Sequence, residues 1–268
     1  MTAGTGRPLE GVGVLVTRPA HQAAGLAQRV ADLGGIPILF PGLAIEPLAP
    51  PALDLSGVDL AVFVSPNAVD HAVAPLLAAG GLPPTARIAA VGSATAARIE
   101  ASGIRTPGAA PLLVPHAGFD SEALLEHLPA ADVAGRRVLI FRGEGGRALL
   151  GEALRARGAR VEYVQTYRRR RPQADLGELA HDWRQGRIGA TLATSAEIVT
   201  NLFAMAGAAA HLLRGTPMFV PHPKVAAAAF HQGVQSLMVA GNGDEALASG
   251  LATWFGRLRP EPSSQSRA

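Results

Sequence analysis

The segment Val14-Leu-Val-Thr-Arg18 decides the fold, because it recurs as Val138-Leu-Ile-Phe-Arg142 at an offset of 138 − 14 = 124 residues. Both copies are short apolar runs typical of buried strands. Each copy leads into an amphipathic stretch that ends at a glycine, Gly34 or Gly158, where the end of a helix is favoured. The two glycines keep the same offset, so the sequence predicts an internal duplication of a strand–helix unit.

Apolar runs rich in Val, Ile and Leu alternate with Ala- and Leu-rich amphipathic stretches along the rest of the chain. This alternation predicts an α/β fold with parallel sheets and helices on both faces of each sheet. We expect strands at residues 12–17, 60–65, 87–91, 137–141, 190–194, 217–220 and 236–240. We expect helices at residues 22–33, 68–79, 94–102, 121–128, 147–157, 196–205, 225–232 and 244–255. A second correspondence, at an offset of 195 − 65 = 130, relates Ser65 to Ser195 after a strand.

Two extended segments, residues 36–47 and 160–172, are longer than ordinary strands. The prolines in the first of them suit an exposed ribbon better than a central strand. We therefore expect two flavodoxin- or Rossmann-like α/β domains joined by a two-stranded antiparallel ribbon, with the first domain discontinuous in sequence. The expected boundaries are residues 10–39 with 173–257 for the first domain, 52–159 for the second, 40–51 with 160–172 for the ribbon, and 258–268 for a disordered tail.

The composition favours a cytoplasmic protein with an acidic partner. Of the 268 residues, 48% are hydrophobic and 17% charged, which allows a large core and excludes wholesale disorder. The absence of cysteine excludes a disulfide scaffold and a thiolate metal site. Residues 1–11 lack the apolar core of a signal peptide, and the apolar run 202–213 is too short to span a bilayer. The net charge is +3, and nearly all the basic residues are arginine, which pairs well with carboxylates. Arg168–Arg171 is the one cationic run in the sequence, so nucleic acid is not the expected partner.

Small polar and basic residues stand at six strand-to-helix turns. Ligands of open parallel sheets bind outside the carboxyl ends of the strands, where free backbone N–H groups at helix starts attract anions. Helix capping is the alternative role for any single Ser, Thr or Asn at such a turn. Six turns together favour a cleft for a large polyanion. The candidate substrate-binding residues are Thr17, Arg18, Ser65, Asn67, Ser93, Thr95, Arg142, Gly143, Arg147, Thr194, Ser195, His222 and Lys224.

The loop Gly143-Glu-Gly-Gly-Arg-Ala148 also fits a dinucleotide-binding pattern, with Glu162 near the position of a ribose-binding acid. The flanking Arg142 and Arg147 suit a carboxylate as well as a pyrophosphate, so a nucleotide-dependent enzyme stays open on this pattern. A two-lobed module that binds a small anion without catalysis stays open too. The scattered histidines form no recognisable ligand motif, and we expect neither a metal nor a cofactor.

Five stretches resemble uroporphyrinogen-III synthases: Val14–Pro19, Phe63–Val69, Ala90–Ala96, Val138–Arg147 and the strand that ends in Tyr167. The similarity runs from about Val12 to Phe255 and lies in the order and spacing of individually degenerate motifs. It implies two α/β domains joined by a two-stranded ribbon. It also implies conversion of hydroxymethylbilane, a linear polyanionic tetrapyrrole, into uroporphyrinogen III with loss of water and inversion of the terminal pyrrole ring, without a metal or a redox step.

The resemblance also assigns roles to single residues. Tyr167 matches the family's tyrosine on the crossing strand and is the candidate proton donor to the leaving hydroxyl, with ribbon packing as its alternative role. Thr95 matches a polar position in the family's cleft, whereas Val225 holds the duplicate position without a hydroxyl and receives no catalytic role. His222 and Lys224 are expected to contact substrate carboxylates. A monomer without membrane or nucleic-acid partners is expected.

Overall fold

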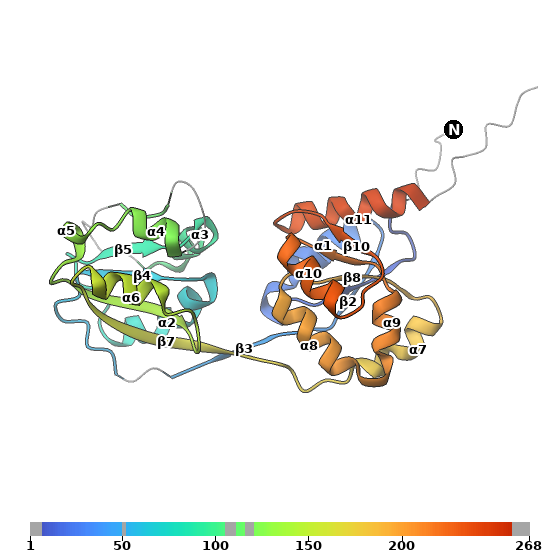
Figure 1. The fold of residues 1–268 in the computed structure, drawn as a ribbon, viewed down its shortest axis with the longest axis horizontal. Helices are drawn as coiled ribbons and strands as arrows, with labels where there is room; N and C mark the ends of the chain where they lie inside the picture. Colours follow the sequence, from blue (N-terminus) through green and yellow to red (C-terminus); the bar gives the residue numbers. More distant parts are fainter. Residues whose placement is uncertain (1–6, 50–51, 105–110, 116–120, 259–268) are drawn as a thin grey trace, which may run out of the picture. The chain divides into compact units, whose positions relative to one another are not determined.

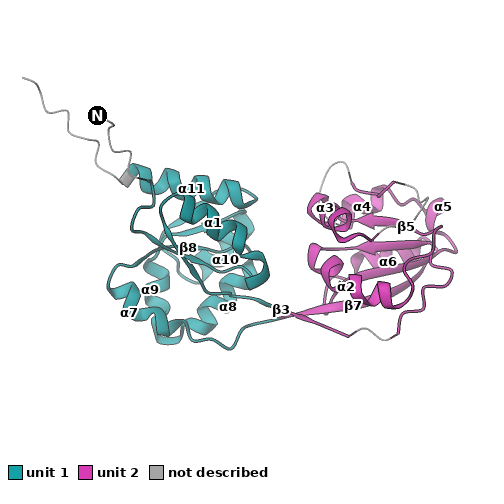
Figure 2. Ribbon diagram, turned by 180° about the vertical axis from the view of Figure 1, so that it is seen from behind, with its two compact units in different colours: residues 1–44, 170–268 teal, residues 45–169 magenta. Residues whose placement is uncertain are grey.

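The computed structural model describes residues 7–49, 52–104, 111–115 and 121–258 of the chain. The chain divides into two compact units: unit 1 holds residues 1–44 and 170–268, and unit 2 holds residues 45–169 (Figure 2). Unit 1 is therefore discontinuous in sequence, and unit 2 is inserted into it. The predicted tail, apart from Leu258, lies outside the described residues.

Unit 1 is built on a five-stranded sheet in which neighbouring strands run parallel. Its strand order is β10 (Leu237–Val239), β9 (Met218–Val220), β8 (Ile188–Leu192), β1 (Gly13–Val16) and β2 (Ile36–Leu39) (Figure 1). Helices α1 (Ala24–Asp32) and α11 (Asp244–Leu258) share one core with this sheet. Helices α8 (Ala196–Ala206) and α10 (Pro223–His231) pack against each other outside that core.

Unit 2 is a three-layer arrangement with a core on each face of its sheet. The strand order is β3 (Ala44–Pro47), β7 (Arg160–Arg170), β6 (Arg137–Gly143), β4 (Leu60–Phe63) and β5 (Arg87–Ala90). Helices α2 (Pro66–Ala78) and α3 (Ser93–Ser102) cover the face where Phe63 and Phe141 stack at 4.7 Å. Helices α4 (Ser121–Glu126), α5 (Ala130–Val133) and α6 (Leu149–Ala156) cover the other face. Alternate residues of β6 enter the two cores, as the two-residue period of a strand requires.

The duplication extends to the register of the strands. The pair Ile140↔Tyr163, moved back by 124 residues, becomes the observed pair Val16↔Leu39. The pair Ala61↔Ile88, moved forward by 130 residues, becomes the observed pair Thr191↔Met218. The shared strand order is β9-β8-β1-β2 in unit 1 and β5-β4-β6-β7 in unit 2. The two sheets are therefore copies of one design, and the predicted α/β fold with two parallel-dominated sheets is confirmed.

The two extended segments differ from the prediction in how they pair. Residues 36–47 split into β2, at the edge of the first sheet, and β3, at the edge of the second. Arg160–Tyr167 pairs with β6 along its length, because Val164 and Tyr167 enter the core of unit 2. Only the end of β7 fits a ribbon. There, the Leu48 N–H donates to the Thr166 carbonyl at 2.9 Å and Arg168 pairs with Glu46, so β3 and β7 run in opposite directions.

One described stretch, Ala196–Gly215, is apolar and long enough by composition to cross a membrane, with a mean hydropathy of 1.4. It is longer than the predicted apolar run because it includes all of α8. Gly207, at φ 49°, divides it into α8, a 3₁₀ turn and α9 (Ala210–Gly215), and Leu202 and Leu213 are fully buried. A broken stretch whose apolar side chains enter the interior of unit 1 is typical of core helices.

Candidate functional site

The predicted site residues fall into two sets, one at the carboxyl edge of each sheet. In unit 2, strands β4, β5, β6 and β7 are parallel, so their carboxyl ends meet at one edge. At this edge each strand carries a candidate near its carboxyl end or in the turn that follows: Ser65, Asn67, Ser93, Thr95, Arg142, Gly143, Arg147 and Tyr167. The edge of unit 1 carries Thr17, Arg18, Thr194, Ser195, His222 and Lys224.

Tyr167 is fixed in a narrow slot near the carboxyl end of β7. Its side chain is 5% exposed, and its Oη lies 3.1 Å from Ser65 Oγ. The Ser65 oxygen accepts the Ala68 N–H at 3.1 Å, which leaves the serine proton free to point at the phenol. A side chain at Gly143 would stand 2.7 Å from the tyrosine ring, so glycine is required there. The phenol is therefore held by packing and by one hydrogen bond.

Thr95 stands in the first turn of α3, a helix that starts without a side-chain cap because its N-cap residue is Gly92. Thr95 is 4% exposed, and its hydroxyl has no hydrogen-bond partner among the described residues. Among those residues, Thr191 alone has an enclosed side-chain polar atom without a partner. The Thr95 oxygen therefore reaches the surface, although the rest of the side chain is buried. A free hydroxyl at an open helix start is suited to an anion.

Arg142 is a buried arginine at the end of β6. It is 6% exposed, its Nε donates to the Gly143 carbonyl at 3.3 Å, and its Cζ lies 4.6 Å from the centre of the Tyr163 ring. No carboxylate of the described residues pairs with it. Among the described residues, its two terminal nitrogens have no hydrogen-bond partner and do not count as enclosed atoms, so they keep some contact with solvent. Arg147, by contrast, is exposed and bonded to Glu122 at 2.8 Å.

In unit 1 two of the corresponding side chains, those of Thr17 and Arg18, are engaged within the protein. Thr17 is fully buried, and its Oγ1 donates to the Leu192 carbonyl at 2.6 Å, so it ties β1 to β8. The prediction that its side chain contacts substrate is therefore wrong. Arg18 pairs with Asp244 of α11 at 2.5 Å. Thr194 is half-buried and Lys224 is exposed.

Helix capping accounts for three candidates. Ser65 caps α2 as described above, and Ser195 Oγ accepts the Ile198 N–H at 3.2 Å at the start of α8. His222 Nδ1 accepts the Lys224 N–H at 3.1 Å at the start of α10, where Pro223 supplies no N–H of its own. Asn67 lies half-buried in the first turn of α2, and Ser93 is exposed at the start of α3. The start of α10 is thus closed by its cap, whereas the start of α3 is open.

Glu162, the acid of the dinucleotide pattern, lies away from the Gly143 loop in the structure. Glu162 pairs with Leu139 across the sheet and bonds to Arg137 at 2.8 Å, at the amino end of β6. Hydrogen bonding to Arg137 lowers the pKa of Glu162. Leu139, which lies opposite Glu162, is four positions before Gly143 along β6, a distance of about 13 Å. A ribose bound at the Gly143 loop would not reach Glu162.

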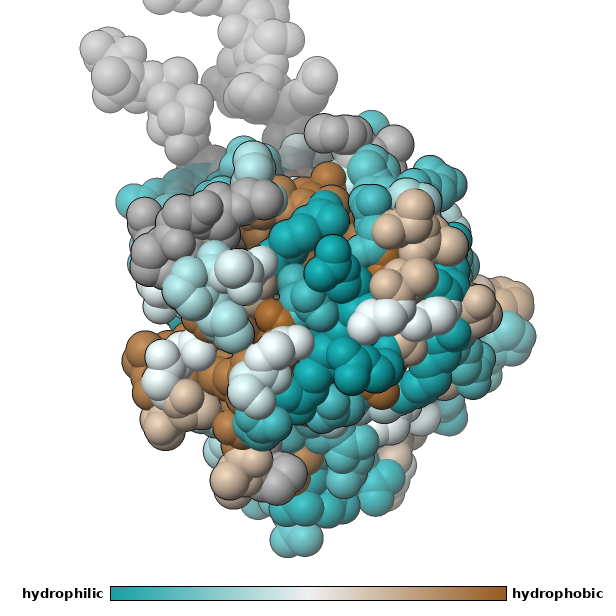
Figure 3. Space-filling view, turned by 90° about the vertical axis from the view of Figure 1, so that its left-hand side faces the viewer, coloured by the Kyte–Doolittle hydropathy of each residue, from teal (hydrophilic) through white to brown (hydrophobic). Residues whose placement is uncertain are grey.

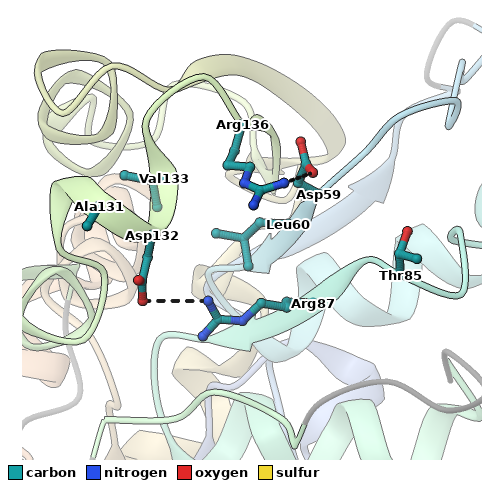
Figure 4. Close-up of a pocket in the computed structure, with 8 residues that line it drawn as sticks. All are labelled: Asp59, Leu60, Thr85, Arg87, Ala131, Asp132, Val133 and Arg136. Atoms are coloured by element: carbon teal, nitrogen blue, oxygen red, sulfur yellow. Dashed lines mark hydrogen bonds and ion pairs between the residues drawn. The ribbon is translucent and has the colours of Figure 1, made fainter.

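A polar pocket lies at the opposite, amino edge of the unit 2 sheet (Figure 4). Its charges are paired internally, Arg136 with Asp59 at 3.0 Å and Arg87 with Asp132 at 3.7 Å. The pocket therefore offers no uncompensated cation to an anionic ligand. One face of unit 2 mixes hydrophilic residues with smaller hydrophobic areas (Figure 3). Among the described residues, no group of three or more His, Asp or Glu is placed to hold a metal.

The sequence model of the family described as uroporphyrinogen-III synthase HemD matches residues 24–247. The chain belongs to the uroporphyrinogen-III synthase family. It is 32% identical to the uroporphyrinogen-III synthase of Salmonella typhimurium over 86% of this chain and 96% of that protein. It is 30% identical to the Escherichia coli uroporphyrinogen-III synthase over the same shares.

Solved structures of this family share the fold. The uroporphyrinogen III synthase of Thermus thermophilus, in a mutant form, matches with a TM-score of 0.57 at 23% identity, over 92% of this chain and 98% of that one. The Helicobacter pylori uroporphyrinogen-III synthetase matches with a TM-score of 0.59 at 14% identity, over 92% and 99%.

Three residues of the unit 2 edge were missed by the sequence analysis: Tyr163, Gly146 and Gly151. A Cβ at Gly146 would collide with the Arg142 guanidinium, and one at Gly151 would collide with the Tyr163 hydroxyl. A usable signal was present for Tyr163, since it is one of only two tyrosines in the chain and lies four residues before the other, Tyr167. The glycines gave none, because their role depends on which side chains approach them in the folded unit.

Proposed function

We propose that the protein is a uroporphyrinogen-III synthase, a lyase that cyclises hydroxymethylbilane with loss of water and inversion of the terminal pyrrole ring. Family membership supports this reaction, and the observation that carries its chemistry is the buried Tyr167 phenol bonded to Ser65. The C–O bond of the terminal hydroxymethyl group breaks, and the oxygen leaves as water after it takes a proton. The distal pyrrole then attacks the resulting azafulvene through its substituted carbon, and rearrangement of the spiro intermediate inverts that ring.

Tyr167 is the proposed donor of that proton. The Tyr167 side chain carries an O–H group that can donate a hydrogen bond to a leaving hydroxyl. When Ser65 donates to the tyrosine oxygen, the tyrosine proton is free for the substrate. The slot formed with Gly143 keeps the phenol in one orientation. Ser65 is therefore proposed both to cap α2 and to orient the donor.

The rest of the task is to hold a flexible polyanion in the one pose that leads to ring inversion. Each pyrrole carries an acetate and a propionate, and a hydrogen bond to a charged group contributes about 1.5–3 kcal/mol. The open start of α3 with Thr95, and the cation Arg142, support anion binding in unit 2. Thr17 is not included among the proposed substrate contacts, because its hydroxyl is enclosed and bonded to Leu192. The other proposed contacts are Arg18, Ser65, Asn67, Ser93, Gly143, Arg147, Thr194, Ser195, His222 and Lys224.

The proposal includes a cofactor-free monomer that works in the cytoplasm without membrane or nucleic-acid partners. It also includes two flavodoxin-like domains joined by an antiparallel ribbon. The unit 1 strands, counted along the chain, lie in the order 2-1-3-4-5, which supports this type. The boundary between domains and ribbon within residues 40–51 and 160–172 stays a prediction.

The test is an isomer assay with freshly prepared hydroxymethylbilane. Reaction products are oxidised to porphyrins, and the type I and type III isomers are separated by chromatography. The protein should yield type III, while the same mixture without protein should yield type I through spontaneous closure. Type I alone in the presence of folded protein would contradict the proposal. A thermal shift with ATP or NAD in such a protein would favour the nucleotide-binding alternative.

A further inference from the structure

Arg142 is a buried charge that no carboxylate of the described residues neutralises. A buried cation without a partner costs stability, so such groups persist mainly where a ligand completes them. Arg142 is 6% exposed, and among the described residues its only hydrogen bond is the 3.3 Å contact to the neighbouring Gly143 carbonyl. Because its terminal nitrogens still reach the surface, they can bond to an anion from outside.

The loop between β6 and α6 is shaped around this guanidinium. Gly146 lies against it, and any side chain there would collide with its terminal nitrogen. Gly145, at φ 68°, supports the turn that brings Gly146 to this position. The loop then leads to Ala148, the N-cap residue of α6, which provides no side-chain cap. The guanidinium and an uncapped helix start therefore lie at the two ends of one short loop, and both favour an anion.

Tyr163 holds the guanidinium in place. Its ring stacks against Arg142 at 4.6 Å, and its hydroxyl donates to the Ala148 carbonyl at 3.2 Å. Gly151 leaves the space that this hydroxyl occupies. Tyr163 thus connects the arginine to the start of α6. The exposed Arg155 also stacks on the ring, at 5.0 Å, but it donates to the Val161 carbonyl.

The duplicate in unit 1 lacks these features. Under the offset of 124, Arg142 corresponds to Arg18 and Tyr163 to Leu39. Arg18 is neutralised by Asp244, and Leu39 is exposed. The same strand end therefore carries a compensated arginine in unit 1 and an uncompensated one in unit 2.

We propose that Arg142, held against the ring of Tyr163 beneath the Gly143–Ala148 loop, is a carboxylate-binding subsite of unit 2, with Tyr163 as its positioning residue. The identity of the ligand rests on the proposed function: one acetate or propionate group of the tetrapyrrole. The subsite itself rests only on the contacts in unit 2.

A succinate titration tests the subsite without any assay of activity. The amide NMR signals of residues 143–148 are followed in wild type, Arg142→Met and Arg155→Met. Wild type and Arg155→Met should show saturable shifts, and Arg142→Met should show none. The Arg155 variant is the matched control because it loses a guanidinium from the same ring. Absence of saturable shifts in wild type, or equal shifts in all three proteins, overturns the subsite.

Kinetics with hydroxymethylbilane test its use in the reaction. Arg142→Met should raise KM about tenfold with little change in kcat, and its Tm should not fall, because the charge is unpaired in the free protein. Tyr163→Leu should raise KM by a similar factor, Tyr163→Phe should restore most of the affinity, and the double variant should be no worse than either single one. An unchanged KM, or an Arg142→Met protein that unfolds or melts earlier, makes the arginine structural and overturns the proposal. A wild type that forms no uroporphyrinogen III but binds succinate would refute the function alone.

Discussion

Units 1 and 2 share one strand order and one register, yet they differ in whether the polar groups at the carboxyl edge of the sheet are bonded within the unit. Unit 1 closes its edge, since Asp244 neutralises Arg18 and His222 caps α10. Unit 2 leaves its edge open, since Arg142 has no carboxylate partner among the described residues and α3 starts at an uncapped Gly92. The difference indicates that the strand-end arginine of unit 2 is available to an anion, whereas the equivalent arginine of unit 1 is compensated within the protein.

The largest effect is expected from removal of the Tyr167 hydroxyl, a feature of unit 2 that has no equivalent in unit 1. Tyr167 corresponds to Leu43 under the offset of 124. Tyr167→Phe should lower kcat about 100-fold and leave Tm nearly unchanged, because it keeps the ring and removes only the proton donor. Steady-state kinetics and a melting curve check this. Trp183→Phe, which deletes a buried 2.8 Å bond to Thr216 in unit 1, should lower Tm without lowering kcat. Wild-type kcat in folded Tyr167→Phe would leave the tyrosine a packing residue.

The second prediction exchanges one hydroxyl between the units. Thr95→Val copies unit 1 into unit 2 and should raise KM about tenfold, since a bond to a carboxylate is lost. Val225→Thr makes the reverse change at a helix start closed by His222 and Pro223, so KM should stay at the wild-type value. Both variants are compared at the same ionic strength. A rise in KM for Val225→Thr but not for Thr95→Val would reverse the assignment of open and closed edges.

The third prediction concerns the ion pair between Arg18 and Asp244 in unit 1. Asp244→Asn leaves Arg18 without its partner, and the free energy of unfolding should fall by about 1 kcal/mol because the pair is largely buried. Glu245→Gln removes the more exposed pair with Arg29 and should cost only a few tenths of a kcal/mol. Both carboxylates lie in the first turn of α11, so the helix dipole affects them alike. Equal losses in urea unfolding would show that the Arg18 pair adds nothing.

The smallest expected effect concerns Glu162, at the amino edge of the unit 2 sheet. Hydrogen bonding to Arg137 lowers its pKa in the folded protein, so its stabilising effect is present above the unfolded pKa of about 4.3 and is lost as pH falls through the folded value. Glu162→Gln should cost about 0.5 kcal/mol at pH 7, because the carboxylate is 55% exposed. The difference in Tm from wild type should shrink as pH falls below the unfolded pKa. A difference that grows on acidification would contradict the pairing.

Most of the fold could be predicted because the determining signals are local. The apolar runs at β1 and β6, and the glycines after α1 and α6, give strands, helices and the duplication directly. The role of β7 could not be assigned correctly, since an extended segment reads the same whether it pairs within a sheet or crosses between domains. Its pairing with β6 depends on how Val164 and Tyr167 pack against α2, which no local pattern specifies.

The site was less predictable than the fold, because its properties depend on what each side chain contacts. Thr17 and Thr95 look alike in sequence, yet one hydroxyl is bonded to Leu192 and the other has no partner in the described part of the chain. Arg18 and Arg142 likewise end equivalent strands, and their difference comes from Asp244, which is 244 − 18 = 226 residues away from Arg18. Sequence reasoning finds the positions, and tertiary contacts decide which are available.

The pairing of β1 with β8 has a consequence for how the chain folds during synthesis. Strand β1 ends at Val16, and its neighbour β8 ends only at Leu192, after all of unit 2 has been made. At about 5–20 residues per second, the 192 − 16 = 176 intervening residues take about 10–35 seconds to emerge from a ribosome. We therefore expect the inserted unit 2 to reach its native state first, while β1, α1 and β2 wait for the C-terminal half of their sheet.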